Sequence, residues 1–249
     1  MCEDCGCQDA NKEYFNENAH THDHEHPHDH NHIHERKTID IEQNVLKKNG
    51  DIAHQNSHWF NDHNVKAINI MSSPGSGKTT LLEKTIPLLK NKILVTLLVG
   101  DQQTDHDANR LLNCGGKVKQ INTHSSCHLD ALMIQKELGG FVDGSEDLLI
   151  IENIGNLVCP SAFDLGENKK IAMLSTTEGE DKPIKYPVLF HRADLILITK
   201  IDLIPHLDWS MEKTKTYIKQ VNPKAKILEI SAKTGEGIER WCEYLIDLL

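Results

Sequence analysis

Residues 65–80 of this sequence read VKAINIMSSPGSGKTT, and they decide the fold. The apolar run from Val65 to Met71 predicts a buried strand, and the apolar periodicity that begins at Thr80 predicts a helix. A Gly-rich turn between a strand and a helix is the context that a P-loop requires. The stretch therefore predicts a phosphate-binding loop at the carboxyl end of a strand.

The chemistry of this loop follows from its residue types. The glycines let backbone N–H groups wrap a phosphate, the helix N-terminus adds its dipole, the lysine reaches the outer phosphates and the first threonine is a ligand for Mg²⁺. Ser72 stands where the strict pattern has glycine, at the entry to the loop, away from the residues that face the phosphates. We expect the nucleotide phosphates to contact Gly75, Ser76, Gly77, Lys78, Thr79 and Thr80.

The same alternation of apolar strand, turn and amphipathic helix continues to the C-terminus, and it predicts a parallel sheet covered by helices. The expected strands lie near residues 65–71, 93–99, 148–154, 171–175, 195–199 and 227–230, and the expected helices span 78–89, 128–138, 211–221 and 238 to the end. Ligands of such a sheet gather at the carboxyl ends of its strands. We expect an α/β domain over residues 65–249, a lead-in of one or two short helices over 38–64, interrupted at Asn49-Gly50, and a metal-binding extension over 1–37 that lacks the apolar side chains to fold alone.

Two of the strands end in acidic residues. Asp101 follows one and Glu152 follows another, and either carboxylate is suited to hold Mg²⁺ directly or through water. The alternative is that each acid only caps a loop. Together with Lys78 and Thr79, they form the expected catalytic set.

The base of the nucleotide is expected to be read after two later strands, by Lys200, Asp202, Ser231, Ala232 and Lys233. These residues resemble the Asn-Lys-x-Asp and Ser-Ala-Lys elements of GTPases, in which the Asp carboxylate accepts from the N1–H and amino groups of guanine. Adenine lacks that pair of donors, so Asp202 favours GTP over ATP. Thr199 replaces the usual Asn, which weakens the match.

Composition excludes several classes of function. The chain has 249 residues, 38% of them hydrophobic, and a formal net charge of −10, which argues against sequence-independent binding to nucleic acid. Its N-terminus has no basic start or apolar core, and its apolar runs are too short to span a membrane. Seven cysteines, several of them spaced for metal, fit a reducing compartment. We expect a cytoplasmic protein.

Two metal-binding patterns lie in the extension. Cys2, Cys5 and Cys7 place three thiols within six residues, which favours a single metal ion; zinc would require a fourth ligand, whereas three sulfurs and an amine suit Ni²⁺. A disulfide or a redox-active tail is the alternative. The second pattern is a histidine run, which predicts metal storage, the alternatives being a purification tag or a pH-sensitive tail; it comprises His20, His22, His24, His26, His28, His30, His32 and His34.

A third cluster is expected inside the domain. Cys127-His128 precedes a predicted helix whose N-terminus would lower the thiol pKa, and Cys159 follows Glu152 by seven residues. Both positions fall at the nucleotide side of the sheet, so a phosphate-dependent movement of the loop would change this metal site. An inert, buried cysteine pair is the alternative.

These elements together resemble the HypB family of hydrogenase maturation GTPases over nearly the whole chain. The resemblance rests on CxxCxC at residues 2–7, the histidine run, SSPGSGKT at 72–79, GDxQTD at 100–105, CHLDA at 127–131, ENIGNLVCP at 152–160 and TEGEDKP at 177–183. It implies a P-loop NTPase of the SIMIBI type that hydrolyses GTP with Mg²⁺. It also implies a tight nickel site at Cys2, Cys5 and Cys7 and a weaker nickel or zinc site at Cys127, His128 and Cys159.

The resemblance further implies partners and a client. They are a HypA-type metallochaperone, the large subunit of nickel-iron hydrogenase, and a second copy of the chain in a GTP-dependent homodimer. Two other functions stay open. The first is that the chain is a nickel store that hydrolyses no GTP. The second is that it serves urease or another nickel enzyme, although urease accessory proteins have a Cys-Pro-His arrangement that is absent here.

Overall fold

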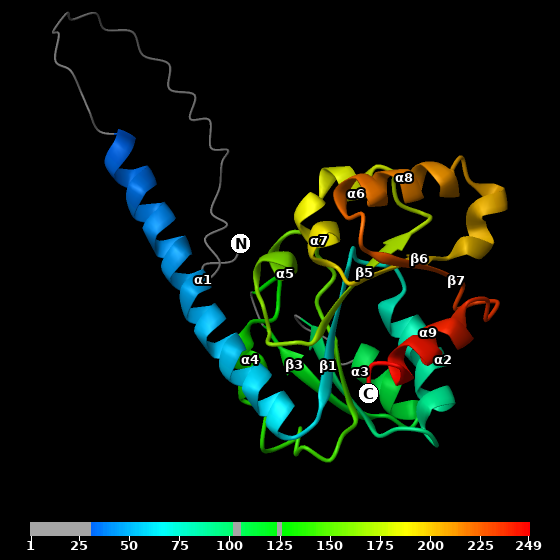
Figure 1. Ribbon diagram of the computed structural model, residues 1–249, viewed down its shortest axis with the longest axis horizontal. Helices are drawn as coiled ribbons and strands as arrows, with labels where there is room; N and C mark the ends of the chain where they lie inside the picture. Colours follow the sequence, from blue (N-terminus) through cyan, green and yellow to red (C-terminus); the bar gives the residue numbers. More distant parts are fainter. Residues whose placement is uncertain (1–30, 102–105, 124–125) are drawn as a thin grey trace, which may run out of the picture.

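Seven parallel strands form one sheet, in the order β3-β2-β4-β1-β5-β6-β7 (Figure 1). The computed structural model describes residues 31–101, 106–123 and 126–249, with only the backbone of residues 31–42. The strands are β1 (Lys66–Ser72), β2 (Val95–Asp101), β3 (Lys117–Asn122), β4 (Leu148–Glu152), β5 (Lys169–Ser175), β6 (Leu195–Thr199) and β7 (Lys226–Ile230). The predicted α/β fold with a parallel sheet flanked by helices is confirmed.

The helices occupy both faces of the sheet. They are α1 (Asn31–Asp62), α2 (Lys78–Leu89), α3 (His106–Asn113), α4 (Ala131–Gln135), α5 (Cys159–Ala162), α6 (Lys182–Lys185), α7 (Pro187–Arg192), α8 (Met211–Val221) and α9 (Ile238–Ile246), with a 3₁₀ helix, η1, at Ile201–His206. Helices α2, α3 and α9 pack on one face, where Leu81, Leu111 and Trp241 join a core cluster with the strands. On the other face, α1 and α4 cover one end of the sheet, and α7 and α8 cover the other.

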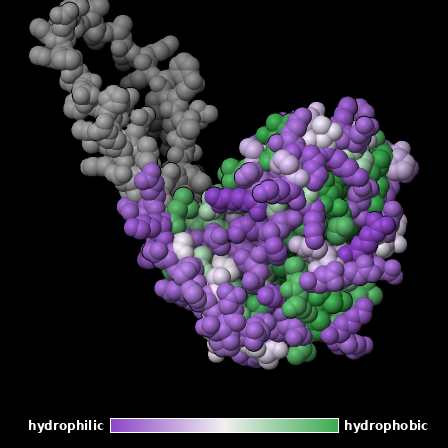
Figure 2. Space-filling model, viewed as in Figure 1, coloured by the Kyte–Doolittle hydropathy of each residue, from purple (hydrophilic) through white to green (hydrophobic). Residues whose placement is uncertain are grey.

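The central strands are buried on both faces, which is why they carry continuous apolar runs. In β1, residues from Ala67 to Ser72 are all buried, and so are all five residues of β4 and of β6. Hydrophilic side chains predominate on the outer face seen in Figure 2, with hydrophobic ones in scattered patches. None of the helices in the described part of the chain has the length and apolar character needed to cross a membrane.

The structure corrects the prediction for the lead-in segment. One continuous helix, α1, runs from residue 31 to 62 through Asn49-Gly50, where a break was expected. Asn49 is committed to the tertiary structure, because its Nδ2 donates to the Asp164 carbonyl at 2.8 Å and its Oδ1 accepts from Ala131 N at 2.9 Å. The predicted division at residue 37 falls within this helix and stays a prediction.

The prediction for residues 128–138 is also wrong. The helix there is only α4, which begins after Asp130, whose carboxylate caps it by accepting from Met133 N at 2.8 Å. Strand β3 and helix α3 were not predicted. In β3 only Val118 and Ile121 are buried, so this edge strand carries a weak apolar pattern.

Candidate functional site

The predicted P-loop connects β1 to α2 at the centre of the sheet. Gly75 and Gly77 have φ angles of 73° and 95°, in the left-handed region that residues with a Cβ rarely adopt. Gly77 is the N-cap of α2, so the helix N-terminus opens onto the loop. This backbone is suited to bind an anion.

Ser72, the departure from the strict pattern, contacts the loop lysine. Its Oγ accepts from Lys78 Nζ at 3.0 Å and donates to the Ser73 carbonyl at 2.8 Å. Burial lowers the pKa of Lys78, while the charge of Glu152 opposes that shift. The lysine is thus held inside the loop, beside the buried carboxyl group at the end of β4.

Glu152 lies next to the P-loop because β4 pairs with β1, with Ile70 opposite Glu152. Its Oε1 accepts from Thr79 Oγ1 at 2.7 Å, whereas its buried Oε2 has no hydrogen-bond partner among the described residues. Burial raises the pKa of Glu152 to about 7, partly offset by the positive charge of Lys78. Asp101 is the last residue of β2, which pairs with β4 on the side away from β1, so it lies at the same carboxyl edge of the sheet as Glu152. The four residues after Asp101 lie outside the described part of the chain.

The loop that follows Glu152 contacts the P-loop directly. A Cβ placed on Gly155 would lie 2.8 Å from Pro74 Cα and 2.9 Å from Pro74 N. Only glycine permits this approach, because real Cβ atoms essentially never come so close to backbone. The P-loop and the segment that leads to Cys159 are therefore in direct contact at Pro74 and Gly155.

A cavity of about 320 Å³ lies beside the P-loop. Asp202 is at its wall, and its Oδ1 accepts from Ser231 Oγ at 2.6 Å. Thr199 Oγ1 donates to the Ser76 carbonyl at 2.9 Å, so the residue in the place of the usual Asn links β6 to the P-loop. Four of the five predicted base-reading residues line this cavity, and the fifth, Ser231, is bonded to Asp202. The lining residues are Ser76, Gly77, Thr80, Leu81, Thr199, Lys200, Asp202, Leu203, Ile230, Ala232 and Lys233.

Glu178 is a residue at this site that the motif analysis did not assign. Its carboxylate accepts from Ser73 Oγ at 2.5 Å and from Ser76 Oγ at 2.9 Å, which ties two P-loop hydroxyl groups to the end of β5. The Thr-Glu-Gly-Glu-Asp run at 177–181 was the only signal, and it gives no indication of this partner. Glu178 is thus a support of the P-loop.

Three potential metal ligands meet on the same side of the sheet. The ligand atoms of Cys127, His128 and Cys159 all lie within 4.8 Å of one another. The His128 ring is buried and stacks on Phe163 with 3.9 Å between ring centroids. Burial lowers the pKa of His128, which keeps the imidazole neutral and able to donate a lone pair to a metal. The prediction that these three residues share one place is confirmed, while their occupancy by metal stays a prediction.

The expected effect of a helix on Cys127 is not present. Helix α4 begins at Ala131, so Cys127 lies three residues before its cap, Asp130. The chain bends at Cys127 and His128, before the helix cap at Asp130. Cys159, by contrast, begins the short helix α5.

The predicted metal ligands of the extension cannot be placed. Cys2, Cys5, Cys7, His20, His22, His24, His26, His28 and His30 lie outside the described residues. His32 and His34 lie on α1, where only the backbone is described. Their roles remain predictions.

Comparison with known proteins places this site in context. The family model described as CobW/HypB/UreG, nucleotide-binding domain, matches residues 66–229. The Hydrogenase maturation factor HypB of Azotobacter chroococcum is 48% identical over 211 residues, which cover 85% of this chain and 69% of that protein. The Hydrogenase/urease maturation factor HypB of Helicobacter pylori is 38% identical over 216 residues, covering 85% and 88%.

Two solved structures share the fold closely. HypB from Archaeoglobus fulgidus superposes with a TM-score of 0.76 at 42% identity, covering 81% of this chain and 98% of that chain. HypB from Helicobacter pylori in complex with nickel has a TM-score of 0.75 at 37% identity, covering 80% and 94%. The pocket at the P-loop is accordingly that of a nucleotide-binding domain.

Proposed function

We propose that this chain, which belongs to the family of HypB hydrogenase maturation factors, is a GTP-hydrolysing nickel metallochaperone for nickel-iron hydrogenase. One observation carries the proposal: the thiol, imidazole and thiol of Cys127, His128 and Cys159 lie together, with Cys159 on the segment that follows Glu152 and the other two on the segment that follows β3. Sulfur and imidazole suit nickel, and a related HypB structure is a complex with nickel.

GTP is the proposed substrate because of the chemistry of Asp202. Its carboxylate offers two acceptors to the N1–H and amino groups of guanine, and the hydroxyl of Ser231 fixes its orientation. Adenine would leave this carboxylate without donors, which costs affinity in a closed pocket. Lys200 and Lys233 line the same cavity.

Mg²⁺ is the cation that the P-loop residues fit. Thr79 Oγ1 and Glu152 Oε2, which has no hydrogen-bond partner among the described residues, would be oxygen ligands beside the loop, with Asp101 a third at the same edge of the sheet. When bound, Mg²⁺ neutralises charge on the outer phosphates. Lys78 binds the outer phosphates, the P-loop amides orient them, and Glu152 must give up its proton to act as a ligand.

Hydrolysis is proposed to act on the metal cluster through the segment from Glu152 to Cys159. Gly155 contacts Pro74 of the P-loop, and Cys159 supplies one thiol of the cluster. A change at the outer phosphates then changes the position of Cys159 relative to Cys127 and His128. The GTP and GDP states would differ in nickel affinity and in the population of a homodimer.

The extension is proposed to supply the other metal functions. Cys2, Cys5 and Cys7 hold one nickel ion tightly, and the histidines from 20 to 34 store more. A HypA-type metallochaperone and the hydrogenase large subunit are the proposed partners. Zinc is a competing occupant of the cluster at Cys127.

A metal titration with nucleotide tests this function. Nickel and zinc are titrated into the full chain, a Cys2/Cys5/Cys7→Ala triple variant, a variant lacking residues 20–34, and Cys127→Ala, each with GDP or a non-hydrolysable GTP analogue. We expect lower stoichiometry in the first two variants, and in Cys127→Ala unchanged GTP hydrolysis with loss of the nucleotide effect. Unchanged stoichiometry in both N-terminal variants, or many bound ions with no GTP hydrolysis, would contradict the proposal.

Maturation of urease is a second candidate. It is favoured by the Helicobacter pylori relative, which is named a hydrogenase/urease maturation factor. Deletion of the gene, followed by assays of nickel-iron hydrogenase and of urease in the same cells, separates the two clients. Loss of urease activity alone would favour the second.

A further inference from the structure

Asn153 follows Glu152 directly and belongs to neither the nucleotide site nor the metal cluster. Its side chain is buried, with 1% of the residue exposed. A buried amide must place two donors and one acceptor correctly, because each unmade hydrogen bond costs free energy. The contacts of Asn153 therefore indicate what it holds in place.

The side-chain oxygen of Asn153 binds the segment that carries Cys127 and His128. Oδ1 accepts from Leu129 N at 3.2 Å and from Ile154 N at 2.9 Å. Leu129 is fully buried and comes directly after His128. One oxygen atom thus joins the residue after His128 to the residues after Glu152.

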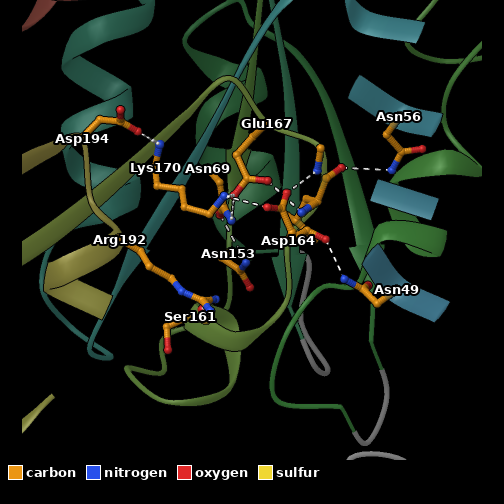
Figure 3. Close-up of polar contacts among 12 residues, drawn as sticks. Asn49, Asn56, Asn69, Asn153, Ser161, Asp164, Glu167, Lys170, Arg192 and Asp194 are labelled. Carbon is orange, nitrogen blue, oxygen red and sulfur yellow. Dashed lines mark hydrogen bonds and ion pairs between the residues drawn. The ribbon is translucent and has the colours of Figure 1, made fainter. Parts of the chain in front are cut away.

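The orientation of this amide is set by its neighbours (Figure 3). Lys170 Nζ lies 3.1 Å from Glu167 Oε1, and the same oxygen accepts from Asn69 Nδ2 at 3.1 Å. Asn69 therefore presents its Oδ1 to Asn153 Nδ2, at 3.2 Å. Asn153 has only its oxygen left to present to Leu129, which is the arrangement that the Leu129 N–H requires.

A different element holds the next part of the same segment. Asn49 of α1 accepts from Ala131 N at 2.9 Å, and Asn56 of α1 donates to the Ala131 carbonyl at 2.8 Å. Helix α1 contributes no residue to the described nucleotide cavity. The segment from 127 to 131 is thus attached at Leu129 to the end of β4 and at Ala131 to α1.

The metal cluster has two halves, Cys159 and the Cys127-His128 pair, and the position of each half depends on the end of β4. Cys159 is connected to Glu152 by the chain, and His128 is connected to it through Leu129 and Asn153. From this geometry, and resting on the proposed nucleotide-dependent nickel binding, we propose that Asn153 is the positioning residue that couples the Cys127-His128 half of the cluster to the nucleotide site. Movement of Glu152 or Ile154 then moves both halves of the cluster, and not Cys159 alone.

The test compares two asparagines with similar bonds to the same segment. Asn153→Ala removes the acceptor of Leu129 N, and the matched control Asn49→Ala removes the acceptor of Ala131 N. Nickel affinity is measured with GDP and with a non-hydrolysable GTP analogue in the full chain carrying Cys2/Cys5/Cys7→Ala, so that the sulfur-to-nickel charge-transfer band reports the cluster and not the N-terminal thiols. The ratio of the two affinities is the coupling, which for such sites is typically about 5- to 150-fold.

We expect Asn153→Ala to bring this ratio to within about twofold of one. Asn49→Ala is expected to lower affinity in both states and to keep the wild-type ratio. A wild-type ratio in Asn153→Ala, or equal loss of the ratio in Asn49→Ala, would overturn the inference and leave the proposed function standing. A ratio of one in the wild type would refute the proposed coupling itself, and the inference with it.

Hydrogen exchange in the unmodified protein provides a test that does not depend on a variant folding. The Leu129 amide should exchange at different rates with GDP and with the GTP analogue, because its acceptor is attached to Glu152. The Ala131 amide should exchange at the same rate in both. Equal rates at Leu129 in the two states would overturn the inference.

Discussion

Replacement of Gly155 by alanine tests the contact between the P-loop and the metal loop. The added Cβ would lie 2.8 Å from Pro74 Cα and 2.9 Å from Pro74 N, which are backbone atoms that cannot rotate away. The two loops must separate by about 0.6 Å to restore an ordinary contact. Pro74 is exposed, so in the nucleotide-free protein the loops are free to part.

The size of the effect follows from overpacking. Inserting a methyl group where there is no space typically costs about 1–3 kcal/mol. Because the free loops can part, we expect the free energy of unfolding to fall by less than about 1 kcal/mol. A bound triphosphate requires both loops in place, so most of the strain should appear as an affinity for the GTP analogue that is about 5- to 150-fold weaker.

The assay is fluorescence titration of nucleotide together with urea denaturation. Gly50→Ala is the control, because nothing lies within 4 Å of its Cβ in the middle of α1. That variant should gain about 0.5–1 kcal/mol of stability and bind nucleotide as the wild type does. If Gly155→Ala binds the GTP analogue within twofold of the wild type, the contact between the loops does not support nucleotide binding.

Three further predictions concern the pocket and the core. Asp202→Asn replaces two acceptors with a donor and an acceptor, which suits xanthine instead of guanine. In competition assays we expect affinity for GTP to fall at least about 100-fold and XTP to bind better. An unchanged preference for GTP would show that Asp202 does not recognise the base. Burial raises the pKa of Glu152 to about 7, so the carboxyl is protonated below that pH and must lose its proton to bind Mg²⁺. Affinity for Mg²⁺ and nucleotide should therefore rise from pH 6 to 8 with proton release, measured by calorimetry in two buffers, and Glu152→Gln should remove that dependence; a flat profile in the wild type would contradict the argument. Trp241→Phe removes the Nε1–H that donates to Thr85 Oγ1 at 3.0 Å in the core. The free energy of unfolding, measured by urea denaturation, should fall by about 1–3 kcal/mol. A loss below about 0.5 kcal/mol would show that this hydrogen bond does not stabilise the core.

Local patterns in the sequence were sufficient for the P-loop and for most of the sheet. The prediction for α2, Lys78 to Leu89, agrees with the structure at both ends, because a Gly-rich turn and an apolar period are local signals. Strands β1, β4, β5 and β6 were recognised because burial on both faces requires continuous apolar runs, and the edge strand β7 was recognised from its shorter apolar run. Cys127, His128 and Cys159 were expected on the nucleotide side of the sheet, and they meet there at the carboxyl ends of β3 and β4, the two strands that flank β2.

Contacts between residues far apart in the chain decided the rest. Helix α1 continues through Asn49-Gly50 because Asn49 binds Asp164 and Ala131, more than 80 residues away, and no local propensity contains that information. The partner of Glu178 and the two attachments of Asn153 are of the same kind. A single polar side chain has no sequence periodicity that could reveal its role, which depends on which donor or acceptor the folded chain brings within hydrogen-bond distance. The sequence by itself therefore determined the fold class and the candidate ligands, while only the tertiary structure decided how the nucleotide site and the metal cluster are joined.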